Sequence, residues 1–150
     1  MATSAFALRK DPAYLDARRS GALARMQIHI VDDLGRDVPD AEVNVFMGMN
    51  FRPKGHYLKG VTDTNGIYVA VGKTCGDEIE ISIGKFGYYP SKRKLCYATM
   101  GRERPVSDGK WQPYCDMQQM VLRKIRNPIS TERFWKFRYT KAIHYHPIAA

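Results

Sequence analysis

Apolar and polar residues alternate along several short segments of the chain, which is the pattern of strands with one buried face. The clearest example lies at 79–83, where three isoleucines alternate with a glutamate and a serine. Further segments of this kind occur at 26–31, 43–47, 57–62, 67–71, 94–97 and 117–125. Asp63-Thr64-Asn65-Gly66 is the strongest turn between them, because Asn-Gly adopts positive φ at little cost. The spacing of strands and turns predicts an all-β sandwich.

The segments that flank this pattern differ from it. A short helix is predicted over 11–25, with Asp11 as its cap and Pro12 at its first position. Residues 98–110 are polar and contain glycine, so we expect a loop there. Three parts are therefore predicted: an N-terminal helical arm at 1–25, the sandwich at 26–126 and a basic, aromatic C-terminal tail at 127–150.

Charge is unevenly distributed along a chain whose net charge is +9. Residues 26–84 hold 5 basic and 9 acidic side chains, 85–104 hold 6 and 1, and 123–141 hold 7 and 1. Such basic segments favour a solvated surface or an anionic partner such as nucleic acid or an anionic surface. No apolar run approaches the roughly 20 residues that cross a bilayer, so no transmembrane segment is predicted.

Three motifs resemble those of carboxypeptidase-regulatory-like and transthyretin-like (prealbumin-like) domains, in order and in spacing. They are the run from Val31 to Val43, with glycine at 35 and alanine at 41, the hairpin from Thr62 to Tyr68, and the segment from Ile83 to Tyr89. The resemblance implies an antiparallel seven-stranded Greek-key β-sandwich, with the short N-terminal helix before it and the extended tail after it.

The segments 109–114 and 121–129 extend the resemblance to exported bacterial proteins that carry this module. An extracellular or cell-envelope location is implied, although Arg9 and Lys10 follow the first apolar residues instead of preceding them, unlike a signal peptide. Localisation is therefore not determined by the sequence. A disulfide between Cys96 and Cys115 would need an oxidising compartment and is left open.

Two enzyme families share features with this chain. Intradiol ring-cleaving dioxygenases resemble it in the Thr62–Tyr68 hairpin, and they hold ferric iron with two tyrosines and a His-x-His pair, which His144 and His146 imitate. The candidate tyrosines are Tyr88, Tyr89, Tyr114 and Tyr139. Transthyretin-related hydrolases of cyclic ureides also resemble the fold, but His29 and His56 do not complete their set, and the chain ends without their Tyr-Arg-Gly-Ser motif.

The tail alternates aromatic and basic residues, which suits a segment with one apolar and one cationic face. The predicted partner-binding residues are Arg133, Phe134, Trp135, Lys136, Phe137, Arg138 and Tyr139. A protein partner or a second copy of the chain is the favoured contact, and an anionic membrane or nucleic acid are the alternatives.

Together these features predict a non-enzymatic structural or interaction module, in which a sandwich scaffold docks through its terminal arms. No catalytic residue, cofactor or metal is assigned. The alternatives are an iron-dependent intradiol-type dioxygenase using His144 and His146, or an electrostatic binder of nucleic acid or anionic surfaces.

Overall fold

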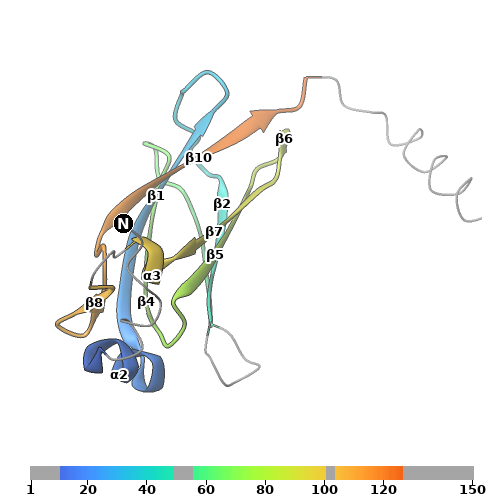
Figure 1. Cartoon of the computed structure of the whole chain (residues 1–150). Coiled ribbons are helices and arrows are strands. Elements are labelled where there is room, and N and C mark those ends of the chain that lie inside the picture. Colours follow the sequence, from blue (N-terminus) through green and yellow to red (C-terminus); the bar gives the residue numbers. More distant parts are fainter. Residues whose placement is uncertain (1–10, 49–55, 101–103, 127–150) are drawn as a thin grey trace, which may run out of the picture.

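The computed structural model describes residues 11–48, 56–100 and 104–126, which form a two-layered β-sandwich with two short helices (Figure 1). The helices are α2 (Pro12–Ser20) and α3 (Tyr97–Met100). The strands are β1 (Ala22–Asp32), β2 (Glu42–Met47), β3 (His56–Val61), β4 (Ile67–Thr74), β5 (Glu78–Gly84), β6 (Tyr88–Tyr89), β7 (Ser91–Cys96), β8 (Val106–Ser107), β9 (Lys110–Trp111) and β10 (Asp116–Lys124). The predicted all-β sandwich is confirmed.

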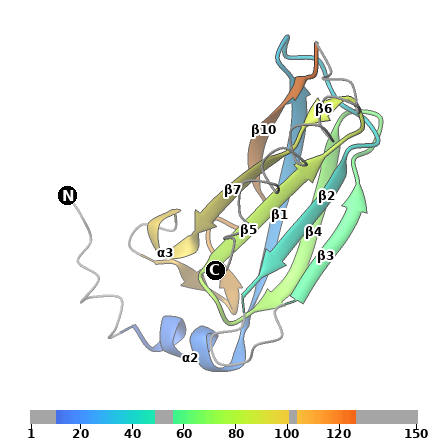
Figure 2. The ribbon, with the colours of Figure 1, turned by 90° about the vertical axis from the view of Figure 1, so that its right-hand side faces the viewer.

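The strands divide into two sheets that face each other. In the β1 sheet the order is β6-β10-β1-β9-β8, with β4 also paired to β1. The β2 sheet has the order β3-β2-β5-β7, and Figure 2 shows it in front of β1 and β10. The core lies between the sheets and is formed by the buried side chains of every second residue in β1, β2 and β5.

β1 organises the first sheet, because it pairs with β4 on one side and with β10 on the other. Its core-facing residues are Ala22, Ala24, Met26, Ile28 and Ile30. The pairing with β10 is parallel, which corrects the prediction of a wholly antiparallel sandwich. A crossover from β7 in the other sheet precedes β10, and a long connection of this kind permits parallel pairing where a tight hairpin does not.

The predicted turn at 63–66 is confirmed. The Asp63 carboxylate accepts hydrogen bonds from the backbone N–H groups of Asn65 (2.9 Å) and Ile67 (2.8 Å). Gly66 has a φ of 70°, and a Cβ at this position would lie 2.6 Å from the Ile30 carbonyl oxygen. Glycine is therefore required here both by the positive φ and by the close approach of β1.

Two boundaries differ from the sequence-based prediction. The helix expected over 11–25 ends at Ser20, where Gly21 follows with a φ of 83°, and β1 begins at Ala22. Alanines carry little strand preference, so the buried Ala22 and Ala24 gave no strand signal. The loop predicted over 98–110 instead contains most of α3, together with β8 and β9. Within the described parts of the chain, neither helix has the length or hydropathy needed to cross a bilayer.

Trp111, in β9, is the largest fully buried side chain of the described residues. Its indole is fully buried, stacks on Tyr97 at a centroid distance of 5.5 Å, and meets the Tyr14 ring edge-on at 6.0 Å. Its Nε1–H donates to the Thr74 carbonyl oxygen at 2.9 Å. Trp111 thus joins α2, α3 and β4 around one ring.

We expect Trp111→Ala to destabilise the protein by about 3–5 kcal/mol, because it leaves a cavity among three elements and orphans the Thr74 carbonyl. Urea unfolding followed by circular dichroism measures this change. Met117→Ala is the matched control, since this apolar side chain on β10 is 50% exposed and its loss should cost no more than about 0.5 kcal/mol. Equal effects of the two substitutions would contradict the central role of Trp111.

Candidate functional site

The strands run between two chemically different ends of the sandwich (Figure 1). We call the end that carries α2 the helix end. The other is the exit end, where β1 finishes at Asp32 and the last described residue, Arg126, lies. The parallel register places the start of β10 near the helix end and its last residues at the exit end.

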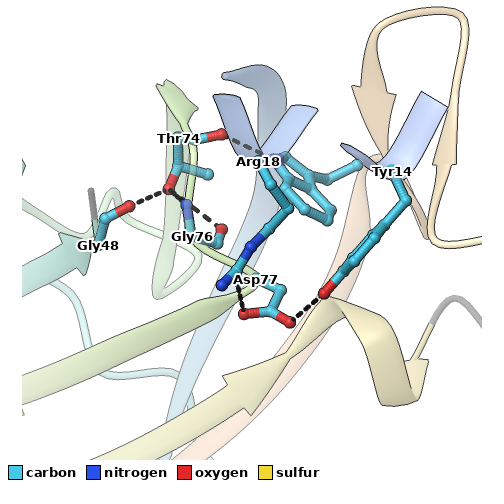
Figure 3. A network of polar contacts seen from close by, with 7 residues as sticks. Tyr14, Arg18, Gly48, Thr74, Gly76 and Asp77 are labelled. Atoms are coloured by element: carbon cyan, nitrogen blue, oxygen red, sulfur yellow. Dashed lines mark hydrogen bonds and ion pairs between the residues drawn. The ribbon is translucent and has the colours of Figure 1, made fainter. Parts of the chain in front are cut away.

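At the helix end, Asp77 binds two side chains of α2 (Figure 3). The Tyr14 hydroxyl donates to one carboxylate oxygen at 2.9 Å, and Arg18 Nη1 donates to the other at 2.5 Å. Burial, followed by the bond to Asp77, raises the pKa of Tyr14 to about 12. The phenol therefore keeps its proton at neutral pH, and the carboxylate is fully engaged in holding the helix to the sandwich.

The buried Thr74 closes the same end of the molecule (Figure 3). Its hydroxyl donates to the Gly48 carbonyl oxygen at 2.7 Å and accepts from the Gly76 N–H at 3.1 Å. Nearby, the hydroxyl of Tyr97 is buried and has no hydrogen-bond partner among the described residues, and burial raises the pKa of this phenol. These groups are arranged for packing rather than for proton transfer.

The exit end is organised around Asp32, whose side chain is only 5% exposed. One carboxylate oxygen accepts from the N–H groups of Leu34 (2.8 Å) and Arg36 (2.9 Å). The other accepts from the Arg36 guanidinium, at 2.8 Å from Nε and 2.7 Å from Nη2. The bonds from the Arg36 backbone and side chain hold the pKa of Asp32 below its usual range, and the bond to Asp32 raises the pKa of Arg36.

Tyr88 lies at this end, in the short strand β6. It pairs with Lys124, and the N–H of Ile125 donates to the Gly87 carbonyl oxygen at 2.9 Å. The ring is half-buried and packs against the core. Arg126 follows at once, and its Nη2 binds Asp33 at 2.7 Å. The chain therefore leaves the sandwich directly beside Tyr88.

The structure separates the tyrosines proposed as iron ligands. Tyr114 precedes β10 at the helix end, where Lys110 Nζ lies 5.1 Å from its ring centroid. β10 alone spans roughly 26 Å from Asp116 to Lys124, at about 3.3 Å per residue. Tyr114 and Tyr88 thus cannot ligate one ion. Tyr89 is adjacent to Tyr88, but neighbouring strand residues point to opposite faces, and its side chain is 56% exposed.

Several predicted site residues fall outside the described residues. They are Arg133, Phe134, Trp135, Lys136, Phe137, Arg138, Tyr139, His144 and His146. The structure therefore does not test the predicted partner-binding segment or the histidine pair. Within the described residues, no group of three or more His, Cys, Asp or Glu side chains is arranged to hold a metal.

The two described histidines are not brought together. His29 lies on the outer face of β1 and its Nε2 is 2.8 Å from Asp37 Oδ1, whereas His56 begins β3 in the other sheet. These two histidines therefore share no site. Cys96 and Cys115 are half-buried thiols with no disulfide between them.

Three of the described basic residues of 85–104, Lys92, Arg93 and Lys94, lie on β7. The Lys92 and Lys94 side chains are 72% and 73% exposed and share one carboxylate, that of Glu80, at 3.6 and 3.8 Å. Arg93 turns instead to the other sheet, where its Nη1 donates to the Gln119 carbonyl oxygen at 3.0 Å. Binding of nucleic acid or an anionic surface stays a prediction, because no described contact tests it.

The chain has similar solved structures but no match by sequence. No family model matches it, and no curated protein sequence matches it either. Among solved structures, it is similar to 3-chlorocatechol 1,2-dioxygenase from Rhodococcus opacus 1CP (13% identity, 70% of this chain and 61% of that chain, TM-score 0.51). It is also similar to chlorocatechol 1,2-dioxygenase from Pseudomonas putida (12% identity, 69% of this chain and 61% of that chain, TM-score 0.52). A third similar structure is catechol 1,2-dioxygenase from Acinetobacter radioresistens (13% identity, 76% of this chain and 56% of that chain, TM-score 0.53).

At these identities the likeness shows the fold, the β-sandwich of catechol dioxygenases, and this chain spans about three fifths of the length of those chains. The comparison corrects the functional prediction. The sequence predicts a non-enzymatic structural protein with a transthyretin-like module, whereas the solved structures similar to it are ring-cleaving enzymes. The prediction that the chain is not an enzyme is therefore wrong on this finding. The finer transthyretin-like assignment has no matching family model or curated sequence.

The arginine partners of the exit end were missed by the sequence analysis. Gly35 was recognised as part of the motif from Val31 to Val43, but the side-chain bond from Arg36 back to Asp32 was not predicted. The signal was available, since an aspartate that ends a strand commonly accepts N–H bonds from the turn that follows. The ion pair of Arg126 with Asp33 joins residues 93 positions apart and has no local signal.

The Asp32 network predicts a specific acid sensitivity. Because its folded-state pKa is lowered, Asp32 contributes stability that is present above its unfolded pKa of about 3.9 and is lost as the pH falls through the folded value. Asp32→Asn should lower the melting temperature at pH 7 and flatten its fall below about pH 4. Calorimetry across pH 2–7 measures both effects.

Asp40→Asn is the matched control for this experiment. Asp40 is exposed at the same end and has a φ of 50°, which asparagine also tolerates. This variant should retain the melting temperature of the parent at pH 7. An Asp32→Asn protein as stable as the parent at pH 7 would show that the network contributes nothing to folding.

Proposed function

We propose that the chain is an iron-dependent ring-cleaving dioxygenase of the intradiol type, acting on a catechol-like aromatic diol. The observation that carries the proposal is the likeness of its sandwich to catechol and chlorocatechol 1,2-dioxygenases. The hairpin from Thr62 to Tyr68 and the pair His144 and His146 support it, since both resemble features of that family. Because a fold alone does not define an activity, the ligand set must be argued residue by residue.

The iron of this family is held by two tyrosines and a His-x-His pair, and the described residues fit that set at one position. Tyr114 is excluded by its place at the helix end, and Tyr89 by its exposure on the far side of Tyr88. Tyr88 is half-buried beside the point where the chain leaves the sandwich. The proposed ligands are Tyr88, Tyr139, His144 and His146.

The described residues around Tyr88 have definite roles in this proposal. Core packing fixes the ring, and the pairing with Lys124 fixes the backbone of β6. The Arg36 guanidinium, held by Asp32, places a cation near Tyr88 that attracts an anionic diol. Bound ferric iron would supply the coordination of the diol oxygens and the activation of the ring towards dioxygen.

We expect the purified full chain to bind iron and to show a visible tyrosinate-to-iron absorption band. Tyr88→Phe removes one of the two proposed tyrosine ligands and should weaken iron binding by roughly 10–100-fold or more, with a weaker and shifted band. Elemental analysis and absorption spectroscopy after reconstitution with iron measure both. Cleavage of catechol, followed as loss of substrate, is the separate test of activity.

Tyr114→Phe is the matched control, because it removes one hydroxyl at the opposite end and should leave iron content and absorption unchanged. If the full chain binds no iron and shows no visible band, the proposed function is wrong. If the two variants lose iron equally, the assignment of Tyr88 is wrong.

A further inference from the structure

The exit end exposes an unusual set of apolar side chains, which we call the exit patch. It consists of Leu34 (67% exposed), Phe86 (103%) and Tyr89 (56%). Leu34 stands in the turn after β1, and Phe86 stands at the tip of the turn between β5 and β6. Large apolar side chains gathered at one place on a surface commonly mark a contact site.

The two turns are neighbours, because the end of the described chain bridges them. The Ile125 N–H donates to Gly87, next to Phe86, and Arg126 binds Asp33, next to Leu34. The last residues of the described chain therefore lie between the two exposed tips. Whatever follows Arg126 starts in the middle of the exit patch.

Aspartates lie around this patch, among exposed basic side chains such as Arg36, Arg123 and Lys124. Exposed aspartates at the same end are Asp33, Asp37, Asp40 and Asp63. Residues 37–40 and 63–66 lie together because both segments form backbone hydrogen bonds with Ile30, near the end of β1. The Val38 N–H donates to the Ile30 carbonyl oxygen, and the Ile30 N–H donates to the Gly66 carbonyl oxygen. The ion pair between Arg126 and Asp33, at 2.7 Å, is already one contact of this rim with a basic residue of the C-terminal region. The surface is thus apolar at its centre, and the four aspartates, which we call the acidic rim, lie at its margin.

We propose that residues 133–141 of this same chain dock on the exit patch. Their composition complements it, with four aromatic residues for the apolar centre and four basic ones for the acidic rim. The aromatic residues are Phe134, Trp135, Phe137 and Tyr139, and the basic ones are Arg133, Lys136, Arg138 and Lys141. The six residues at 127–132 can span roughly 20 Å when extended, which is ample for a segment that starts within the patch.

Docking of this segment also has a consequence for the site. It would hold Tyr139 and the residues after it at the same end as Tyr88, and this consequence rests on the proposed function. The docking itself does not, since it needs only the patch, its acidic rim and the point at which the chain leaves the sandwich.

Tryptophan fluorescence tests the proposal, because the chain has two tryptophans, Trp111 and Trp135. In a Trp111→Phe protein, Trp135 is the sole reporter. We expect blue-shifted emission and protection from acrylamide at concentrations where light scattering gives a monomer. The double substitution Leu34→Ser and Phe86→Ser should shift the emission to longer wavelength and increase quenching. High salt should produce a smaller shift and a smaller increase in quenching, because it screens the attraction between the basic residues of 133–141 and the acidic rim.

Val69→Ser is the matched control, since this valine is 42% exposed on β4, outside the exit patch, and should change nothing. If Trp111→Phe does not fold, the parent protein serves, because fully buried Trp111 is shielded and the quenchable emission belongs to Trp135. Emission from Trp135 like that of a free peptide overturns the proposal, as does protection insensitive to the double substitution. Protection that appears only together with a dimeric mass assigns the patch to a second copy and also overturns it.

Iron analysis on the same samples separates the two proposals. A protected Trp135 in a protein that binds no iron refutes the dioxygenase and leaves the docking intact. An iron-bound protein with a fully exposed Trp135 refutes the docking and leaves the dioxygenase.

Discussion

The arrangement of this molecule depends on the parallel pairing of β1 with β10, which runs in register from Met26 with Asp116 to Asp32 with Leu122. An antiparallel partner would have brought the end of β10 back to the helix end. The parallel partner carries it to the exit end, beside the turn after β1 and beside β6. Tyr114 lies just before β10, and Tyr88 pairs with the last residue of β10. The two tyrosines are consequently separated by the whole length of the sandwich. The register therefore decides which side chains can share a site and where the C-terminal region leaves the sheet.

The two ends that this register creates satisfy their polar groups in different ways. At the helix end, Asp77 takes bonds from Tyr14 and Arg18, so a carboxylate is used to fasten α2 over the buried Trp111. At the exit end, Asp32 is satisfied within its own turn, mostly by backbone N–H groups and one guanidinium. A buried carboxylate with four donors stays charged without a partner from another element. The exit end is thereby ordered, yet its apolar tips Leu34 and Phe86 remain uncovered by any described residue.

The sandwich and its central turn could be predicted because their signals are local. The alternation of apolar and polar residues at 79–83 indicates a strand with one buried face, and Asn65-Gly66 indicates a turn that needs positive φ. The direction of β10 could not be predicted, since the same alternation fits either direction of pairing. The strand that holds Trp111 could not be predicted, because a two-residue strand in a polar segment has no periodicity. Of the candidate site, the tyrosines were recognised by residue type, but their separation follows from long-range register, which no local pattern contains.

The likeness to catechol dioxygenases and the geometry of this chain constrain function in different ways. The shared sandwich supplies a frame, and a frame of this kind supports several activities. A metal centre additionally needs side chains that converge on one point. The β1–β10 register leaves Tyr88 and Tyr89, but not Tyr114, at the end where the chain leaves the sheet, and of these two only Tyr88 packs against the core. The helix end, with its carboxylate engaged and its phenols held protonated by burial, is already committed to packing. The proposed iron site is therefore compatible with the exit end and not with the helix end, since a core-packed phenol and a paired guanidinium lie at the exit end.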